Sequence, residues 1–200
     1  MPKIPLTPLA YNKIKALQPE PIRRVTFNMT RFINIYQYDN KACNEAIIRA
    51  IREEGGTLTR ETVVKAYMTD WILKLDHNAE PYSDFFAFIN NSLTTSIHKL
   101  SGVTKEKIRY RFANIWGAIY KDGDYTQSHS HAPTQISFVY YLMADPIDSS
   151  PLVFDEIDYS ITPKTGMLVM CPGWLTHHVP PYKPLSVNDR IVLAGNIEML

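Results

Sequence analysis

The sequence is poor in the residues that mark several common classes of protein. It has only two cysteines, Cys43 and Cys171, in 200 residues. These are too few for a disulfide framework and form no Cys-x-x-Cys pair, so we expect a reducing, cytoplasmic location. Its eight glycines include one adjacent pair, Gly55-Gly56, and no phosphate-binding loop. There is also no internal repeat or low-complexity tract.

Charge and hydrophobicity give no sign of a nucleic-acid or membrane partner. The chain has 21 Lys and Arg against 20 Asp and Glu, a formal net charge of +1, which does not attract a polyanion strongly. The basic residues between Lys99 and Arg111 are typical of a solvated edge. No apolar run reaches the roughly 18 residues of a membrane span. The N-terminus, Met1-Pro2-Lys3-Ile4-Pro5, lacks the apolar core of a signal peptide.

Hydrophobic residues make up 45% of the chain, which is enough for one domain with a hydrophobic core. In the N-terminal half, apolar residues at helical spacing predict two helices. The first covers 41–54 and ends at Gly55. The second covers 84–100 and would begin after Ser83 as its capping residue.

From Ile108 onward the pattern changes to short apolar runs separated by Gly, Pro and Asp, which is typical of strands. The strands we expect there cover residues 108–120, 135–143, 151–154, 158–162, 167–171 and 190–197. Residues 22–38 predict one or two more strands, and 59–75 predict a short helix or turn followed by a strand ending near Leu75. Helices followed by short strands indicate an α+β protein whose strand-rich half closes into a double-sheet roll.

Four of the six histidines lie in two short windows of this strand-rich half: His129 and His131, then His177 and His178. His129 and His131 are two residues apart, so on an extended backbone both side chains leave the same face. A third imidazole from a distant strand would complete a triangle of nitrogen ligands, which suits iron, zinc, copper or nickel. Three ligands on one face leave positions open for substrate and oxygen.

The residues around these windows follow a recognisable order over about 108–198. They are Tyr120-x-x-Gly123-x-x-x-x-x-His129-x-His131, Tyr140-Tyr141-Leu142, Gly166-x-Leu168, Pro172, His177-x-Val179-x-Pro181 and Arg190. This ordered set resembles the Fe(II)- and 2-oxoglutarate-dependent oxygenases, in particular the prolyl hydroxylase branch and its small stand-alone bacterial and phage members.

The resemblance implies a double-stranded β-helix, a jelly-roll or cupin-like core, flanked by N-terminal helices. We therefore expect a single domain over 1–200, in which 1–107 are a mainly helical support with strands and 108–198 are the catalytic core. It also implies a dioxygenase, most simply a hydroxylase, that couples decarboxylation of 2-oxoglutarate to oxidation of a C–H bond. Fe(II) would be the metal, 2-oxoglutarate the cosubstrate and molecular oxygen a further substrate.

The resemblance also assigns roles to individual residues. His129 and His177 match metal ligands, with His178 as a neighbour that points the other way. Arg190 matches the arginine that binds the far carboxylate of 2-oxoglutarate, because a planar guanidinium suits a bidentate carboxylate. Tyr141 and Tyr120 match pocket tyrosines that contact the cosubstrate. Asn114 is a further candidate contact that follows from the strand and not from the resemblance, because it would share a face with Tyr120 and an inward Asn needs a polar partner.

His131 departs from the family pattern, in which an aspartate is the second ligand. Three interpretations stay open: His131 is itself a ligand, it only lines the pocket and water takes the vacant position, or a carboxylate such as Asp155 binds from elsewhere. We favour the first, which makes His129, His131 and His177 the metal-binding and catalytic set. Three neutral imidazoles would leave the complex of Fe(II) and 2-oxoglutarate neutral, whereas one carboxylate would make it negative. The neutral complex stabilises higher oxidation states less.

Two other functions remain open on the sequence. One is a three-histidine cupin-type dioxygenase that does not use 2-oxoglutarate, and the presence of Arg190 and Tyr141 argues against it. The other is a non-catalytic metal-binding domain, which only a turnover measurement would separate from an enzyme. The prime substrate is a small molecule or a peptidyl group that the sequence does not identify, and the N-terminal hundred residues offer surface for a homo-oligomer.

Overall fold

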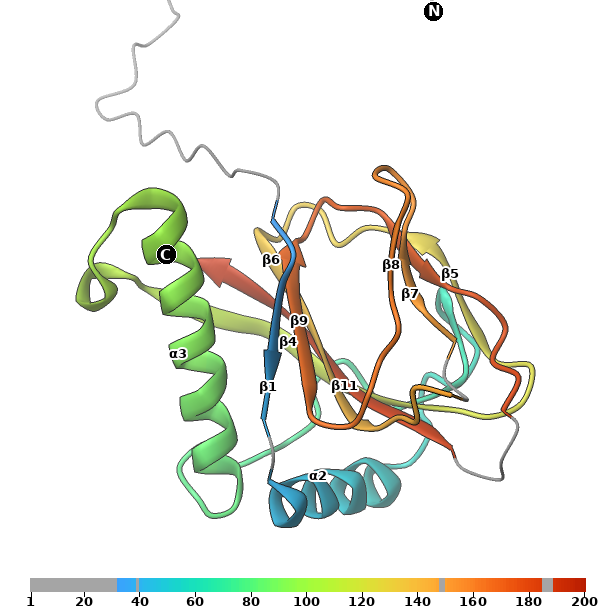
Figure 1. Ribbon diagram of the computed structural model, residues 1–200. Coiled ribbons are helices and arrows are strands. Elements are labelled where there is room, and N and C mark those ends of the chain that lie inside the picture. The colour runs from blue at the N-terminus through green and yellow to red at the C-terminus, as the bar shows by residue number, and fades with distance from the viewer. Residues whose placement is uncertain (1–31, 39, 148–149, 185–188) are drawn as a thin grey trace, which may run out of the picture.

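The computed structural model describes residues 32–38, 40–147, 150–184 and 189–200. Two antiparallel sheets face each other, and two helices cover the outer side of one of them (Figure 1). In chain order the elements are β1 Asn34–Gln37, α2 Lys41–Glu54, β2 Val64–Lys65, β3 Tyr67–Met68, α3 Tyr82–Ser101, the 3-10 helix η1 Lys105–Lys107, β4 Tyr110–Tyr120, β5 Tyr125–His129, β6 Ile136–Met143, β7 Leu152–Phe154, β8 Tyr159–Ile161, β9 Met167–Pro172, β10 His177–Val179 and β11 Arg190–Met199.

The larger sheet, which we call the major sheet, has six strands in the order β1-β9-β6-β11-β4-β3. Its long central strands β4, β6 and β11 are buried over most of their length. On the outer side, α2 and α3 pack their apolar stripes against this sheet to form one hydrophobic core. Gly117 lets α2 approach β4, because a Cβ at Gly117 would lie 2.3 Å from a side-chain carbon of Ile51. The helices therefore support the sheet from outside, as the sequence predicted.

The smaller sheet, the minor sheet, has five short strands in the order β2-β5-β10-β7-β8. A second hydrophobic core lies between the two sheets and contains Trp116, Tyr141, Phe154 and Val192. The chain passes from the minor sheet to the major sheet between β2 and β3, which are separated by one residue. Residues 108–200 thus contribute most of both sheets, and the expected α+β double-sheet roll is confirmed.

The two helices lie where the sequence predicted them. The side chain of Asn40 accepts a hydrogen bond from the backbone N–H of Cys43 at 3.0 Å and caps α2, which ends before Gly55. The predicted capping role of Ser83 is wrong. The helix α3 already begins at Tyr82, and the Ser83 hydroxyl donates backward to Glu80 instead of capping the helix.

The sequence prediction missed two strands, β5 and β10, which are the strands that carry histidines. Both are short, and their outward positions are occupied by polar residues, so neither shows an apolar run. In residues 59–75 the structure has turns and the two-residue strands β2 and β3, so the strand expected near Leu75 ends earlier, at Met68. Any strand within 22–31 lies outside the described residues. No helix among the described ranges is long and apolar enough to cross a membrane.

Candidate active site

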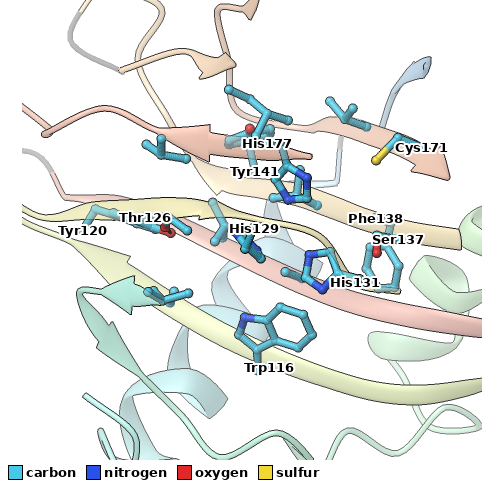
Figure 2. Close-up of a pocket in the computed structure, with 18 of the residues that line it drawn as sticks. Trp116, Tyr120, Thr126, His129, His131, Ser137, Phe138, Tyr141, Cys171 and His177 are labelled. Carbon is cyan, nitrogen blue, oxygen red and sulfur yellow. Dashed lines mark hydrogen bonds between the residues drawn. The ribbon is translucent and has the colours of Figure 1, made fainter. Parts of the chain in front are cut away.

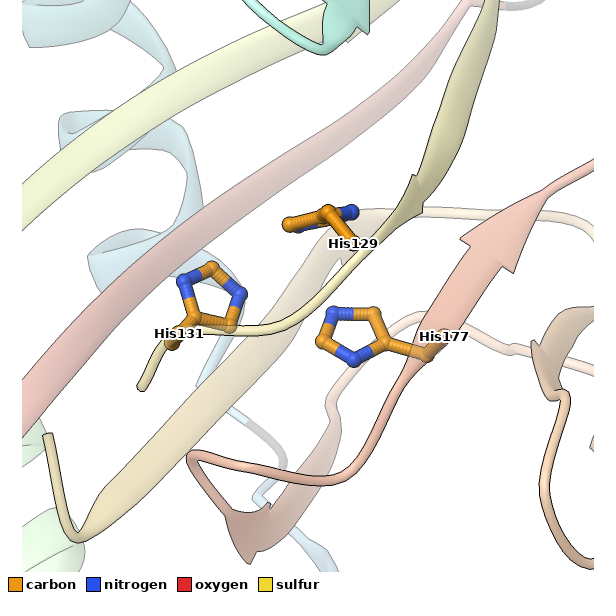
Figure 3. A group of neighbouring side chains, drawn as sticks. All are labelled: His129, His131 and His177. Carbon is orange, nitrogen blue, oxygen red and sulfur yellow. The ribbon is translucent and has the colours of Figure 1, made fainter. Parts of the chain in front are cut away.

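Three histidines from the two predicted windows meet between the sheets. His129 ends β5 and is the cross-strand partner of His177, which begins β10. His131 follows β5 by two residues and turns its ring toward the other two (Figure 3). One potential ligand atom from each histidine lies within 4.8 Å of those of the other two. The convergence expected from the sequence is therefore present, and it includes His131.

Backbone carbonyls orient two of the three rings in the same way. Nδ1 of His129 is 2.8 Å from the carbonyl of Gln127, and Nδ1 of His177 is 2.9 Å from the carbonyl of Leu175. An imidazole that donates its Nδ1–H to a carbonyl keeps the Nε2 lone pair for a metal. The arrangement thus fixes the tautomer that a metal ligand requires.

Burial keeps these histidines neutral. It lowers the pKa of His131 to about 3, and the neighbouring His177 and His129 add to the effect. It lowers the pKa of His177 to about 4, with His129 contributing next, and it also lowers the pKa of His129. Neutral imidazole is the form that binds metals, so all three rings are ready for a metal at neutral pH.

The spacing of the ligand atoms is close to that of a metal site. Two nitrogens bound at about 2.0–2.1 Å to one ion are at most about 4.2 Å apart, whereas the cluster spans up to 4.8 Å. Three nitrogen donors on one side of a cavity fit zinc, iron or another imidazole-binding metal.

Asp155, the alternative carboxylate ligand, is not part of the cluster. Its Oδ2 accepts a hydrogen bond from Ser128 at 2.5 Å, and its Oδ1 lies 2.6 Å from Nδ1 of His178. Its backbone N–H donates to the carbonyl of Thr176 at 3.1 Å. Both carboxylate oxygens are therefore engaged with neighbours of the clustered histidines, and His178 points away from the cluster as expected.

The histidines line a narrow cavity of about 70 Å³ between the sheets, together with Trp116, Tyr120 and Tyr141 (Figure 2). Arg190, the first residue of β11, also lines this cavity. A volume this small is far below the roughly 300–1,000 Å³ of pockets for drug-sized ligands. The cavity therefore suits a small molecule.

Arg190 is a buried cation without a described carboxylate partner. It is only 1% exposed, and its guanidinium carbon lies 5.0 Å from the ring centre of Tyr120 and 5.1 Å from that of Tyr141. Its Nη1 donates to the carbonyl of Ser150 at 2.8 Å. Within the described part of the chain, the Nε of Arg190 and the hydroxyl of Tyr141 have no hydrogen-bond partner.

Buried polar groups without partners are costly, so this arrangement calls for an anionic acceptor inside the cavity. Burial raises the pKa of Tyr141 to about 12, which keeps its hydroxyl protonated as a donor. Burial also raises the pKa of Tyr120, whose hydroxyl lies 2.6 Å from the Thr126 hydroxyl. A carboxylate that reaches Arg190 would receive hydrogen bonds from both unpaired groups.

Asn114 is the predicted site residue that the structure does not bring to this cavity wall. Its Oδ1 is buried and has no hydrogen-bond partner among the described residues, yet it does not line the cavity. Two lining residues, Thr126 and Ser137, were missed from the sequence. Neither residue has a local signal, because an isolated Thr or Ser in a strand belongs to no recognisable motif.

Comparison with known proteins gives a result only at the level of structure. No family model and no curated protein matches the sequence. A viral collagen prolyl hydroxylase from Paramecium bursaria Chlorella virus 1, in a 2OG complex, matches with a TM-score of 0.63 and 16% identity, over 82% of this chain and 94% of its own. A prolyl-4-hydroxylase from Pseudomonas putida matches with a TM-score of 0.60 and 18% identity, over 84% and 93%.

The chain has the fold of these hydroxylases. An oxidoreductase of the 2OG-Fe(II) oxygenase family from Burkholderia pseudomallei also shares it, with a TM-score of 0.54 and 13% identity over 78% of this chain and 77% of its own. The expected double-stranded β-helix is thereby confirmed, together with the structural likeness to small prolyl hydroxylases.

Proposed function

We propose that the chain is an Fe(II)- and 2-oxoglutarate-dependent dioxygenase that hydroxylates its substrate. One observation carries this proposal: a three-histidine cluster and a buried arginine, which has no carboxylate partner among the described residues, share one narrow cavity. A metal site alone would suit many enzymes. The arginine adds a place for the second carboxylate of a dicarboxylic acid, and the fold shared with 2OG-Fe(II) oxygenases supports the same interpretation.

Fe(II) would be held by His129, His131 and His177. When bound, iron with 2-oxoglutarate supplies the oxygen activation that oxidises a C–H bond. The chain contributes the geometry, because carbonyls of Gln127 and Leu175 orient two of the rings. Among the described residues no carboxylate joins the three histidines, since the carboxylate of Asp155 is engaged outside the cluster.

The far carboxylate of 2-oxoglutarate would bind Arg190 and the Tyr141 hydroxyl. A charge-assisted pair with a buried arginine is stronger than a neutral hydrogen bond. Tyr120 would act by packing its ring against the guanidinium, since its own hydroxyl is already bonded to Thr126. These contacts argue against a three-histidine dioxygenase without 2-oxoglutarate, because a clamp for a second carboxylate has no use in such an enzyme.

For the substrate we propose a chemical class and not a particular compound. Two of the structural neighbours are named as prolyl hydroxylases, which favours a peptidyl group or a small molecule over a nucleic acid. We further propose that 1–200 act as one domain, with 108–198 as the catalytic core and the preceding residues as its support. The first hundred residues also offer surface for a second copy of the chain.

Anaerobic titration with Fe(II) and then 2-oxoglutarate tests the proposal. The expected result is a visible charge-transfer band that needs both additions, followed on admission of oxygen by formation of succinate. Iron binding without a band on addition of 2-oxoglutarate would favour the three-histidine dioxygenase. A band without succinate in the presence of candidate substrates would favour a non-catalytic metal-binding domain.

A further inference from the structure

The cavity between the sheets extends to both sides of the histidine cluster. Tyr120 lies at one end beside Arg190, and Figure 2 shows Trp116, Ser137 and the ring of His131 at the other end. In the proposed function the far carboxylate of 2-oxoglutarate takes the Arg190 end, which leaves the other end for the prime substrate. We call it the distal end, and its lining residues are His131, Trp116, Ser137, Val139, Cys171 and Ala194.

The floor of the distal end is a row of apolar side chains that the strand register brings together. Ala194 of β11 is the cross-strand partner of both Trp116 of β4 and Val139 of β6. All three belong to the core between the sheets, and we call them the apolar floor. Val139 and Ala194 are half-buried, although their neighbours on both sides in these central strands are buried. The exposure of these two side chains therefore comes from the cavity.

The apolar floor lies level with the histidines. The centres of the Trp116 and His131 rings are 5.9 Å apart, and the ring planes are inclined at 37°. The cavity has a volume of only about 70 Å³. A group that rests on the floor therefore lies beside the histidine cluster, where the C–H bond to be oxidised has to be.

The distal end offers no side-chain charge to pair with a charged substrate. Of the described residues that line the cavity, only Arg190 is charged, since the histidines are neutral, and it lies at the opposite end. The Ser137 hydroxyl donates to Oδ1 of Asn196 at 2.6 Å, and burial raises the pKa of the Cys171 thiol to about 12, which keeps it neutral. A charged group would lose its hydration here without gaining a partner. The distal end therefore suits an uncharged group.

The apolar surface continues from the cavity to the outside of the molecule through a second tryptophan. Trp71 packs edge-on against Trp116, with ring centres 5.0 Å apart, and is 36% exposed. Its backbone is fixed at the edge of the major sheet, because its carbonyl accepts a hydrogen bond from the N–H of Ile115 at 3.0 Å. A rigid indole offers a large contact area at a low cost in conformational entropy. Trp71 thus extends the wall of the distal end to the protein surface.

We propose, on the basis of the proposed function, that the prime substrate enters over Trp71 and places an uncharged aliphatic group on the apolar floor. The C–H bond to be oxidised then lies next to His131, on the side of the histidines away from Arg190. The small side chain of Ala194 limits the size of the group that fits. An aliphatic side chain of a peptide and the carbon chain of a small molecule share this chemistry.

Calorimetry under anaerobic conditions, with protein loaded with Fe(II) and 2-oxoglutarate, tests the substrate class. The probes are acetylated and amidated valine and leucine, their polar counterparts threonine and aspartate, and lysine. We expect the valine and leucine probes to bind at least about tenfold more tightly than the other three, because polar and charged groups lose hydration on the floor. Blocked tripeptides with the same residues between glycines identify the source: tighter binding than the single residue indicates a peptide, and equal binding indicates a small molecule.

Two variants and one control decide whether these residues carry the binding. Trp71→Ala should weaken the best aliphatic probe by about tenfold, the effect of truncating a tryptophan that anchors a ligand. Ala194→Val adds two methyl groups to the floor and should weaken the leucine probe more than the valine probe. Ile72→Ala is the matched control, because it removes a neighbouring side chain that is 66% exposed and leaves the indole wall intact. The charge-transfer band checks that the metal site is intact in each variant.

Binding of the lysine or aspartate probe as tightly as the aliphatic probes would overturn the proposal, as would the absence of any binding by the aliphatic probes. Wild-type affinity in both Trp71→Ala and Ala194→Val would also overturn it. Failure of the proposed function is a different result, because the wild-type protein would then show no charge-transfer band on addition of 2-oxoglutarate, before any probe is added.

Discussion

The two sheets of this protein differ in size and burial, and they supply different residues of the candidate site. The major sheet has long strands, up to 11 residues in β4, and is covered on its outer side by α2 and α3. The minor sheet has strands of two to five residues, and the outward side chains of β5 are exposed. The major sheet supplies the buried Arg190, whereas the minor sheet and the residues just after β5 supply the three histidines.

The histidines of the minor sheet are instead held in place locally, by side chains outside the cavity. Asp155 provides such a fastening. Its carboxylate binds Ser128, which precedes His129, and His178, which follows His177. Asp155 thus ties the two histidine strands together from outside the cavity, where the short strands have few hydrogen bonds of their own.

The largest effect on the site should come from removing a histidine of the minor sheet. We expect His177→Ala to weaken Fe(II) binding by more than about 100-fold. Removing a residue that only hydrogen-bonds to a metal ligand already lowers metal affinity by about 10–100-fold, and removal of a ligand should have a larger effect. Isothermal titration with Fe(II) measures this, and His98→Ala on α3 is the matched control. Unchanged affinity would remove the histidine cluster as the metal site.

The same titration separates the interpretations of His131. His131→Ala should weaken metal binding, and His131→Asp should retain it, because the oxygenases that the sequence resembles have an aspartate ligand at this position. If His131→Ala binds iron like the wild type, His131 only lines the cavity.

Removing the cation of the major sheet should affect the cosubstrate and not the metal. Hydrogen bonds to charged groups contribute about 1.5–3 kcal/mol each, so Arg190→Ala should raise the apparent 2-oxoglutarate constant by tens- to hundreds-fold. Arg190→Lys should restore only part, since a point charge cannot reproduce the guanidinium fork. The dependence of succinate formation on 2-oxoglutarate measures both, with Fe(II) affinity as the control for folding. A wild-type dependence in Arg190→Ala would favour the three-histidine dioxygenase.

A smaller effect should follow from loosening the minor sheet. We expect Asp155→Asn to lower Fe(II) affinity by about tenfold, because the partners that orient metal ligands contribute to affinity. Thr176→Ala is the control. It removes the neighbouring hydrogen bond from Thr176 to Glu156, and this bond does not connect to β5. Equal losses in the two variants would show general loosening of the loop instead of a specific tie through Asp155.

The smallest effect on the site should come from disturbing the support of the major sheet. In Gly117→Ala the new Cβ must displace Ile51 of α2, and overpacking of this kind costs about 1–3 kcal/mol of unfolding free energy. Denaturant unfolding measures this loss. Fe(II) affinity should stay at the wild-type value, because Gly117 faces the helix. A parallel loss of metal binding would show that the two sheets do not act separately.

Much of the major sheet could be predicted from the sequence, whereas two of the five strands of the minor sheet could not. The strands β4, β6 and β11 are apolar over most of their length because both of their faces are buried. The strands β5 and β10 have one solvent-exposed side and only five and three residues. Their sequences therefore carry too little pattern to indicate a strand, although the flanks of their histidines indicated a metal site.

The sequence by itself determined the elements whose signal is local: the helices α2 and α3, the long strands, and the histidine windows with Arg190. The tertiary structure decided which of these side chains face one another. Trp116, Val139 and Ala194 are far apart along the chain and form one row only because β4, β11 and β6 pair in a particular register. Register depends on the burial of whole sheet faces, and for that reason no short stretch of sequence contains it.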